Sequence, residues 1–261
     1  MASHDLEAFL GELADWAAAT GRVGRRYRYG GGPDQVADLL LPGGDGPHRV
    51  AVLLHGGFWR ARFTRAIMAA LAADLAARGW ATWNVEYRRV GTGGGVPETL
   101  DDVRHAIDML PNVAALLDLE RLVAIGHSAG GQLALCAAQG SSLAAVVSLA
   151  GVCDLESAAR DRIGEGAALE FTGGAPAERP DAYAMADPMG LLPLRVEVLL
   201  VHGDADDRVP VQQSRTYARA AGDAGDPCEL MELPGVDHFA LIDPRTAAWA
   251  AVAQRLQALV P

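Results

Sequence analysis

The sequence lacks features on which several classes of protein depend. No run of about 18 apolar residues occurs, so we expect no membrane-spanning helix and no membrane partner. The opening segment, MASHDLEAFLGELADW, has no basic stretch followed by an apolar one, which argues against a cleaved signal peptide. Basic residues form no run and the net charge is −11, so nucleic acid is not an expected partner.

Cysteine is scarce and gives no sign of a disulfide framework. The three cysteines, Cys136, Cys153 and Cys228, are far apart and include no C-x-x-C pair. This pattern fits neither paired disulfides nor a structural zinc site, and it suits the reducing cytoplasm. No His, Asp or Glu cluster has metal-ligand spacing either, so we expect no metal.

What is present is an ordinary globular composition with alternating strand and helix patterns. Half of the 261 residues are hydrophobic, enough for a sizeable core. Strands are expected at 25–29, 35–41, 50–54, 81–85, 122–125, 146–149, 196–201 and 228–233, and helices at 4–19, 64–78, 100–110, 132–139, 211–221 and 247–259. The alternation predicts an α/β fold with a mostly parallel sheet, helices on both faces and an antiparallel edge made by the first two strands. We interpret residues 1–261 as a single domain.

One segment departs from this alternation. Residues 153–195 are rich in Gly, Pro and charge and show no clear strand. Such a long excursion between two strands is typical of a cap over an active site, although a plain surface connection is the alternative.

The strongest local motif is Gly126-x-Ser128-x-Gly130, between an apolar strand and an Ala-rich helix. Small flanking residues let strand and helix pass closely around a sharply turned serine. The following helix N-terminus would direct N–H groups at a developing oxyanion. The motif predicts a nucleophilic serine, whereas the alternative is a Gly-rich turn with an incidental serine.

A second loop has the composition of an oxyanion site. His-Gly-Gly-Phe-Trp follows the apolar strand at 50–54, and its glycines allow the backbone to approach a ligand. We expect the N–H groups of Gly57, Phe58 and Ala129 to bind the oxyanion. His55 is expected to bond the loop rather than to act as a base.

The acid and the base are expected on two later loops. Three carboxylates, Asp204, Asp206 and Asp207, follow the strand at 196–201, and catalytic groups gather at the carboxyl ends of parallel strands. Where the chain order is serine, acid, histidine, His238 is the one histidine that follows these aspartates.

These groups suffice for acyl transfer. The histidine takes the serine proton, the serine attacks an acyl carbon, the aspartate orients the imidazole, and water later frees the acyl group. No organic cofactor is needed, and the expected partner is a small-molecule ester or amide.

Together the motifs HGGFW, EYR, GHSAGG, HGDADDRVP and GVDHF resemble the α/β-hydrolase superfamily from about residue 20 to the end. The resemblance implies that Asp206 is the acid, with Asp204 as second choice. His-Gly-Gly-x-Trp is similar to the oxyanion motif of kynurenine formamidases and related small esterases, whereas hormone-sensitive-lipase-like esterases usually have glycine where Phe58 stands. It also implies a structural Tyr87-Arg88 pair, with Arg88 bound to Asp101 or Asp102.

The expected pocket is lined from the HGGFW loop, the 153–195 excursion and the histidine loop. Apolar candidates, each of which could instead belong to the core, are Phe58, Trp59, Leu155, Phe171, Met189 and Phe239. Arg60 and Arg62 could meet a substrate carboxylate or could be solvated surface arginines.

Several functions remain open on these residues. A serine esterase acting on small carboxylic esters is the first hypothesis, and an arylformamidase acting on N-formylkynurenine-type substrates is the second. Hydrolysis of another small amide, a thioester or a lactone would use the same groups. A non-catalytic binding module on the same fold is the remote alternative. The pattern leaves monomer and homodimer equally open.

Overall fold

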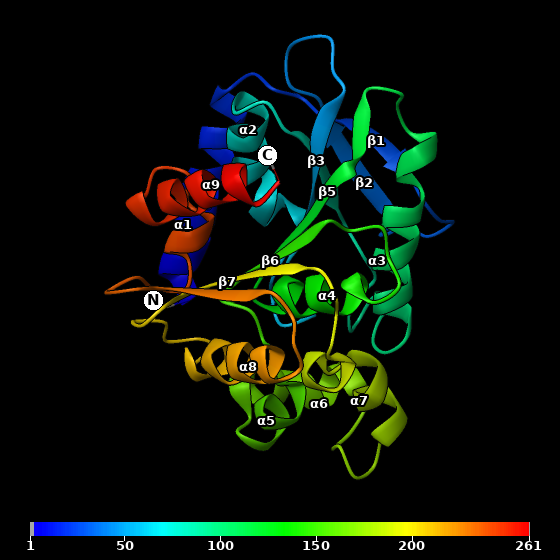
Figure 1. Ribbon diagram of the computed structural model, residues 1–261, viewed down its shortest axis with the longest axis vertical. Helices are drawn as coiled ribbons and strands as arrows, with labels where there is room; N and C mark the ends of the chain where they lie inside the picture. Colours follow the sequence, from blue (N-terminus) through cyan, green and yellow to red (C-terminus); the bar gives the residue numbers. More distant parts are fainter. Residues whose placement is uncertain (1–2, 261) are drawn as a thin grey trace.

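A computed structural model of the protein describes residues 3–260. Eight strands form one sheet in the order β1-β2-β4-β3-β5-β6-β7-β8 (Figure 1). Their bounds are β1 Arg25–Arg28, β2 Val36–Leu40, β3 His48–Leu54, β4 Ala81–Val85, β5 Leu117–His127, β6 Ala145–Leu149, β7 Glu197–Gly203 and β8 Cys228–Leu233.

The sheet is parallel except at one edge. Strands β4, β3, β5, β6, β7 and β8 run parallel to their neighbours, whereas β1 and β2 pair antiparallel and β2 joins β4 antiparallel. This confirms the predicted parallel sheet with an antiparallel edge. Because the parallel strands share one direction, the loops after β3, β5, β7 and β8 all lie at the same edge of the sheet.

Helices cover both faces of the sheet, as predicted. They are α1 Ser3–Ala19, α2 Ala69–Ala77, α3 Glu98–Asp108, α4 Ala129–Ala138, α5 Leu155–Arg160, α6 Ile163–Thr172, α7 Pro180–Ala186, α8 Gln212–Asp223 and α9 Ala247–Leu259. Short 3₁₀ turns lie at η1 Arg65–Met68, η2 Leu110–Asn112, η3 Pro188–Leu191 and η4 Ala240–Ile242.

Two apolar cores lie on opposite faces of the sheet. Along β3, Val50 and Val52 pack in one core, whereas Ala51 and Leu53 pack in the other, as the two-residue period of a strand requires. Buried residues of α3, α4 and α8 belong to the first core, and those of α1, α2 and α9 belong to the second. Figure 1 shows α1, α2 and α9 grouped together, away from α4 and α8.

The 153–195 excursion is helical. It forms α5, α6, α7 and η3 between β6 and β7, and it contains no strand. The backbone is left-handed at the start of α6, where Gly164 and Glu165 have φ of 60° and 61° and the helix is kinked. This bend brings the start of α6 to the loops that follow the parallel strands.

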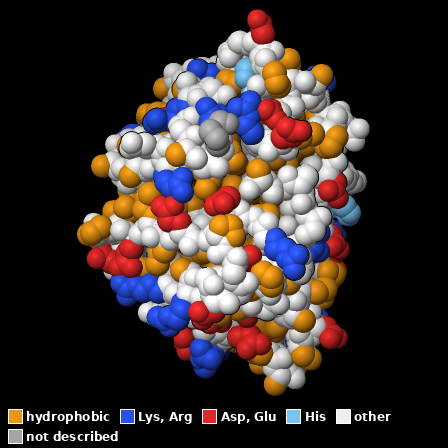
Figure 2. Space-filling model, in the orientation of Figure 1, with side chains coloured by type: hydrophobic (Ala, Val, Ile, Leu, Met, Phe, Trp, Pro, Cys, Tyr) orange, Lys and Arg blue, Asp and Glu red, His pale blue; other side chains and the backbone are white. Residues whose placement is uncertain are grey.

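Within the described residues, no helix combines the length and apolarity that crossing a membrane requires. On the face shown in Figure 2, basic and acidic side chains are interspersed among apolar and neutral surface.

Candidate active site

Ser128 lies in a strained turn between β5 and α4. Its backbone has φ 56° and ψ −119°, a left-handed conformation that side chains rarely adopt. A Cβ at Gly126 would collide with the carbonyl of Gly130, and a Cβ at Gly130 would collide with the carbonyl of Leu54. Glycine at both positions therefore lets strand, turn and helix pass closely enough to present the serine.

His238 and Asp206 form a buried pair at the same edge of the sheet. The Nδ1 atom of His238 lies 2.7 Å from Oδ2 of Asp206, and the two side chains are 4% and 1% exposed. The carboxylate accepts the Nδ1 proton, which leaves Nε2 as the basic nitrogen. The backbone N–H groups of Arg208 and Val209 donate to Oδ1 of Asp206 and fix the carboxylate.

The charge of Asp206 is strongly stabilised. Burial alone would raise its pKa, but hydrogen bonds from His202 and His238 outweigh that effect and hold the pKa well below its usual range. The other two candidate aspartates make different contacts. Asp204 accepts the N–H of Gly235 at 2.6 Å, and Asp207 forms an ion pair with Arg208 at 3.3 Å.

Two buried histidines support this pair, and neither was predicted. The Nε2 atom of His202 lies 3.3 Å from Oδ2 of Asp206 and 2.9 Å from the carbonyl of Val209, so it carries the proton. The hydroxyl of Ser214 then donates to Nδ1 of His202 at 2.7 Å. The signal was the position of His202 at the end of a buried strand, two residues before the aspartate cluster.

The second histidine, His127, precedes the serine in the elbow motif. Its Nε2 lies 3.0 Å from the backbone carbonyl oxygen of His238 and donates to it. Burial and the nearby charge of His238 lower the pKa of His127 to about 3, so the ring is neutral. His127 therefore contacts the loop of the base directly.

The predicted oxyanion donors lie next to the serine. Gly57 and Phe58 follow β3 with φ of 114° and 53°, and Ala129 begins α4. Among the described residues, the N–H groups of these three donate to no protein acceptor. They are therefore available to a ligand, which is the condition for an oxyanion site.

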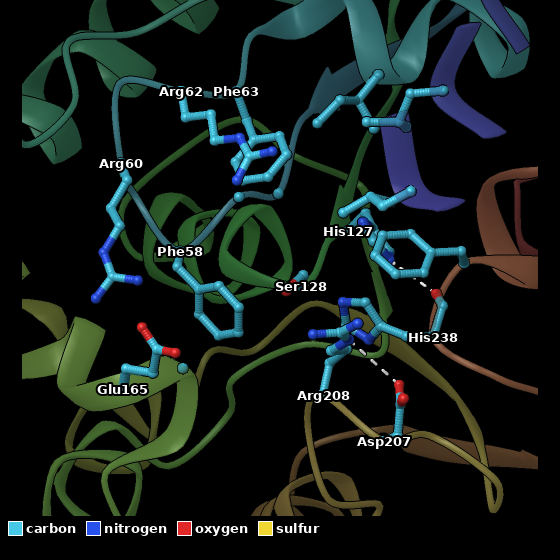
Figure 3. A pocket seen from close by; sticks show the side chains of 17 residues that line it. Phe58, Arg60, Arg62, Phe63, His127, Ser128, Glu165, Asp207, Arg208 and His238 are labelled. Carbon is cyan, nitrogen blue, oxygen red and sulfur yellow. Dashed lines mark hydrogen bonds and ion pairs between the residues drawn. The ribbon is translucent and has the colours of Figure 1, made fainter. Parts of the chain in front are cut away.

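Ser128 and His238 face one cavity of about 480 Å³ (Figure 3). All three predicted segments contribute to it: the oxyanion loop with Gly57 and Phe58, the start of α6 with Gly164, and the histidine loop with Phe239. Further contributions were not predicted, and they come from α1, from Phe63 and η1, and from the acid loop. The lining residues are Leu6, Leu10, Gly56, Gly57, Phe58, Arg60, Arg62, Phe63, Ile67, His127, Ser128, Gly164, Glu165, Asp207, Arg208, His238 and Phe239.

The apolar pocket candidates divide into two groups. Phe58 and Phe239 line the cavity, as expected. Trp59, Leu155 and Phe171 are buried in the core, and Met189 packs against it, so these four residues do not line the cavity. Their placement corrects the expectation of a pocket role.

A specific contact explains the burial of Trp59. Its ring stacks on Phe171 with centroids 4.6 Å apart, and its Nε1–H donates to Gln132 at 3.0 Å. The polar atom of the indole therefore has a partner inside the protein. The tryptophan joins the oxyanion loop to α4 and α6.

Two arginines at the cavity carry carboxylate partners. Arg60 makes two bonds to Glu170 of α6, at 2.8 and 2.7 Å, and Arg62 binds Glu7 of α1 at 2.6 Å. Both line the pocket, so they tie its surrounding elements together.

The residues expected to be structural have that role. His55 is fully buried, with Nε2 3.0 Å from Glu86, and the Tyr87 hydroxyl donates to its carbonyl at 2.6 Å. Arg88 makes a two-pronged ion pair with Asp102, at 2.9 and 2.7 Å. Asp102, rather than Asp101, is therefore its partner.

Within the part of the chain that the structure describes, no three His, Cys, Asp or Glu side chains are grouped so as to hold a metal ion.

Comparison with known proteins places this arrangement in a family. The model of the family described as BD-FAE matches residues 37–220, more than half of the chain. The chain belongs to the BD-FAE family. This is a family of α/β-hydrolases, in agreement with the fold. The BD-FAE match includes Ser128 and Asp206, whereas α1 and His238 lie outside it.

Solved structures with the same architecture carry esterase names. A truncated carbohydrate esterase from gut microbiota has a TM-score of 0.76 at 20% identity, covering 91% of this chain and 97% of that one. A thermophilic esterase from Thermogutta terrifontis has a TM-score of 0.72 at 23% identity, covering 90% of each chain. Esterase B from Lactobacillus Rhamnosis has a TM-score of 0.76 at 16% identity, covering 98% and 94%. These similarities show a shared fold.

One curated relative is much longer than this chain. Dipeptidyl peptidase family member 2 from Caenorhabditis elegans is 31% identical over 148 residues, which are 55% of this chain and 16% of that protein. The similarity therefore concerns one portion of a larger protein.

Proposed function

We propose that this BD-FAE family member is a serine hydrolase that cleaves small carboxylic esters. One observation carries the proposal. The strained turn presents Ser128 to the same cavity as His238, whose Nδ1 lies 2.7 Å from the buried Asp206. A nucleophile, a base and an orienting acid are thus gathered at one edge of the sheet.

The mechanism follows from these positions. Nε2 of His238 takes the hydroxyl proton as Ser128 Oγ attacks the carbonyl carbon, which forms a tetrahedral intermediate. His238 then gives the proton to the departing alcohol oxygen, the C–O bond breaks, and an acyl-enzyme remains. Water attacks the acyl carbon while His238 takes a proton, and return of that proton to Ser128 releases the carboxylic acid.

The developing negative charge has candidate donors nearby. The N–H groups of Gly57, Phe58 and Ala129 would stabilise the oxyanion, because donors already held in place need little reorganisation during the reaction. Asp206 keeps its charge and stabilises the protonated form of His238.

The size of the cavity favours a small substrate. About 480 Å³ accommodates a compact ester rather than a long lipid or a polymer segment. The esterase names of the structural neighbours are in keeping with this substrate class. A soluble small molecule as partner and a cytoplasmic location are part of the proposal.

Hydrolysis of p-nitrophenyl acetate tests the proposal. We expect Ser128→Ala to lower kcat by at least about a thousandfold and Ser141→Ala, in the turn after α4, to leave it unchanged. A fluorophosphonate should label the wild type at Ser128 and should not label the Ala variant. Full turnover by Ser128→Ala would contradict the proposal, and absence of labelling would favour a non-catalytic binding module.

A second candidate function is arylformamidase activity. The observation in its favour is that Arg60 and Arg62 line the cavity beside the oxyanion loop, where a cation could bind the amino-acid carboxylate of N-formylkynurenine. Their present partners, Glu170 and Glu7, would then be exchanged for substrate.

Kinetics on both substrate classes decide between the two functions. We expect a higher kcat/KM on p-nitrophenyl esters from C2 to C8 than on N-formylkynurenine. The reverse order would establish the formamidase. Thioesters and lactones belong in the same panel because the same residues would cleave them.

A further inference from the structure

The N-terminal helix α1 contributes two leucines to the wall of the cavity. Leu6 and Leu10 stand four residues apart, on one face of the helix, and both line the pocket that contains Ser128 and His238. Helix α1 precedes the region matched by the BD-FAE model, which begins at residue 37. This chain therefore completes its pocket with an element that the family match does not cover.

The inward face of α1 serves two purposes. Leu13 is buried in the core, and Phe9 and Trp16 pack against it, which anchors the helix. Leu6 and Leu10 are half-buried and lie outside both apolar cores. Part of their apolar surface therefore faces the cavity, where a bound ligand would cover it.

The helix is held close to the base. The ring of Phe9 lies 6.0 Å from that of Phe239, the residue after His238. Ion pairs add two further ties, from Glu7 to Arg62 at 2.6 Å and from Glu12 to Arg245 at 3.3 Å. These contacts fix the two leucines relative to the proposed catalytic residues.

Most of the other side chains on this side of the cavity are also apolar. Arg62 lies there too, paired with Glu7 of α1 and with its guanidinium carbon 5.5 Å from the centroid of the Phe63 ring. Phe63, Ile67 and Phe239 join Leu6 and Leu10 there, and Ile67 and Phe239 pack against the same core as Phe9. The other charged side chains of the lining, Arg60, Glu165, Asp207 and Arg208, lie at other parts of it, as Figure 3 shows. The cavity is thus mainly apolar beside α1, where Arg62 is paired with Glu7, and more strongly charged beside the cap and the acid loop.

We propose that Leu6 and Leu10 form the end wall of an apolar subsite that binds the aliphatic or aromatic group of the ester and limits its length. The inference rests on the proposed ester hydrolysis. The wall contacts an apolar group that belongs either to the acyl chain or to the alcohol of the ester. The two substrate series of the experiment distinguish these cases.

The test is the chain-length profile of Leu6→Ala, Leu10→Ala and the double variant. One substrate series varies the acyl group, as p-nitrophenyl esters from C2 to C8, and the other varies the alcohol, as alkyl acetates from methyl to octyl. Each methylene that gains a buried contact raises kcat/KM about fourfold. We therefore expect the ratio of C8 to C2 activity to rise at least about fivefold in one of the two series. Leu10→Trp, which adds bulk, should lower that ratio in the same series.

Leu13→Ala is the matched control. It removes the same atoms from α1 but at a position in the core, so it should lower the melting temperature without changing the chain-length ratio. Circular dichroism of each variant verifies folding.

The outcomes separate the inference from the function on which it rests. If the wild type shows no Ser128-dependent ester hydrolysis, the proposed function fails. If the wild type is an esterase and the pocket variants keep its chain-length ratio in both series, the function stands and the role of α1 is overturned. A shift caused equally by Leu13→Ala would also overturn it.

Discussion

The Nε2–H group of His127 donates to the backbone carbonyl oxygen of His238 across 3.0 Å. His127 precedes Ser128 in the elbow motif, so a residue next to the proposed nucleophile fixes the loop that carries the proposed base. The bond needs a proton on Nε2, and burial keeps the ring neutral with its single proton there by lowering the pKa of His127 to about 3.

We predict that His127→Leu lowers kcat about tenfold to a hundredfold, because the loop of His238 loses a fixed contact and small displacements of a base are costly. His127→Gln places an amide donor near the same point and should restore kcat to within about threefold of the wild type. Steady-state kinetics on p-nitrophenyl acetate provide the measurement. Equal losses in both variants would show that the bond to the carbonyl is unimportant.

The same histidine should make stability depend on pH. Unfolding returns its pKa from about 3 to the ordinary 6.5. Between these values the unfolded chain binds one proton more than the folded chain, so the free energy of unfolding falls as pH falls. His127 contributes a slope of about 1.4 kcal/mol per pH unit in that window.

Urea denaturation from pH 4 to 7 tests this dependence. We expect the slope of the unfolding free energy against pH to be smaller in His127→Gln by about 1.4 kcal/mol per pH unit, the contribution of one proton. His105→Gln, at an exposed site on α3, should keep the wild-type slope. Identical slopes for all three proteins would mean that His127 is protonated in the folded state. Asp206 contributes with the same sign at lower pH, because its pKa is also depressed by folding.

The three aspartates after β7 should differ sharply in importance. We predict that Asp206→Asn lowers kcat by about a thousandfold to ten-thousandfold, because the pair with His238 loses its charge and the tautomer is no longer fixed. Asp204→Asn and Asp207→Asn should retain activity to within about threefold, since these side chains bind Gly235 and Arg208. A comparable loss in Asp204→Asn would transfer the role of the acid to that residue.

The ends of the strands could be predicted from the sequence because they depend on local patterns of residues. Apolar runs marked the buried strands, and polar residues directly after them had to meet at one edge of a parallel sheet. Ser128, His238 and a set of three aspartates were predicted in this way, and the family resemblance selected Asp206 among them. The structure places Asp206 2.7 Å from His238. Their catalytic roles stay predictions.

Contacts between distant segments could not be predicted in the same way. The leucines of α1 read as one face of an amphipathic helix, and nothing in their spacing separates Leu13, in the core, from Leu10, at the cavity. The sequence likewise did not decide whether Trp59 lines the pocket or belongs to the core. Its burial depends on Gln132 and Phe171, which stand more than 70 residues later in the chain.

Trp59 should therefore affect stability more than substrate binding. Trp59→Phe keeps an aromatic ring against Phe171 but leaves the buried Gln132 oxygen without its donor, which costs about 1–3 kcal/mol. We predict a lower midpoint of urea denaturation and a KM for p-nitrophenyl butyrate within about twofold of the wild type. Phe58→Leu is the informative comparison, because Phe58 lines the cavity and its replacement should change KM with little loss of stability. If Trp59→Phe raised KM strongly at unchanged stability, the tryptophan would contact the substrate after all.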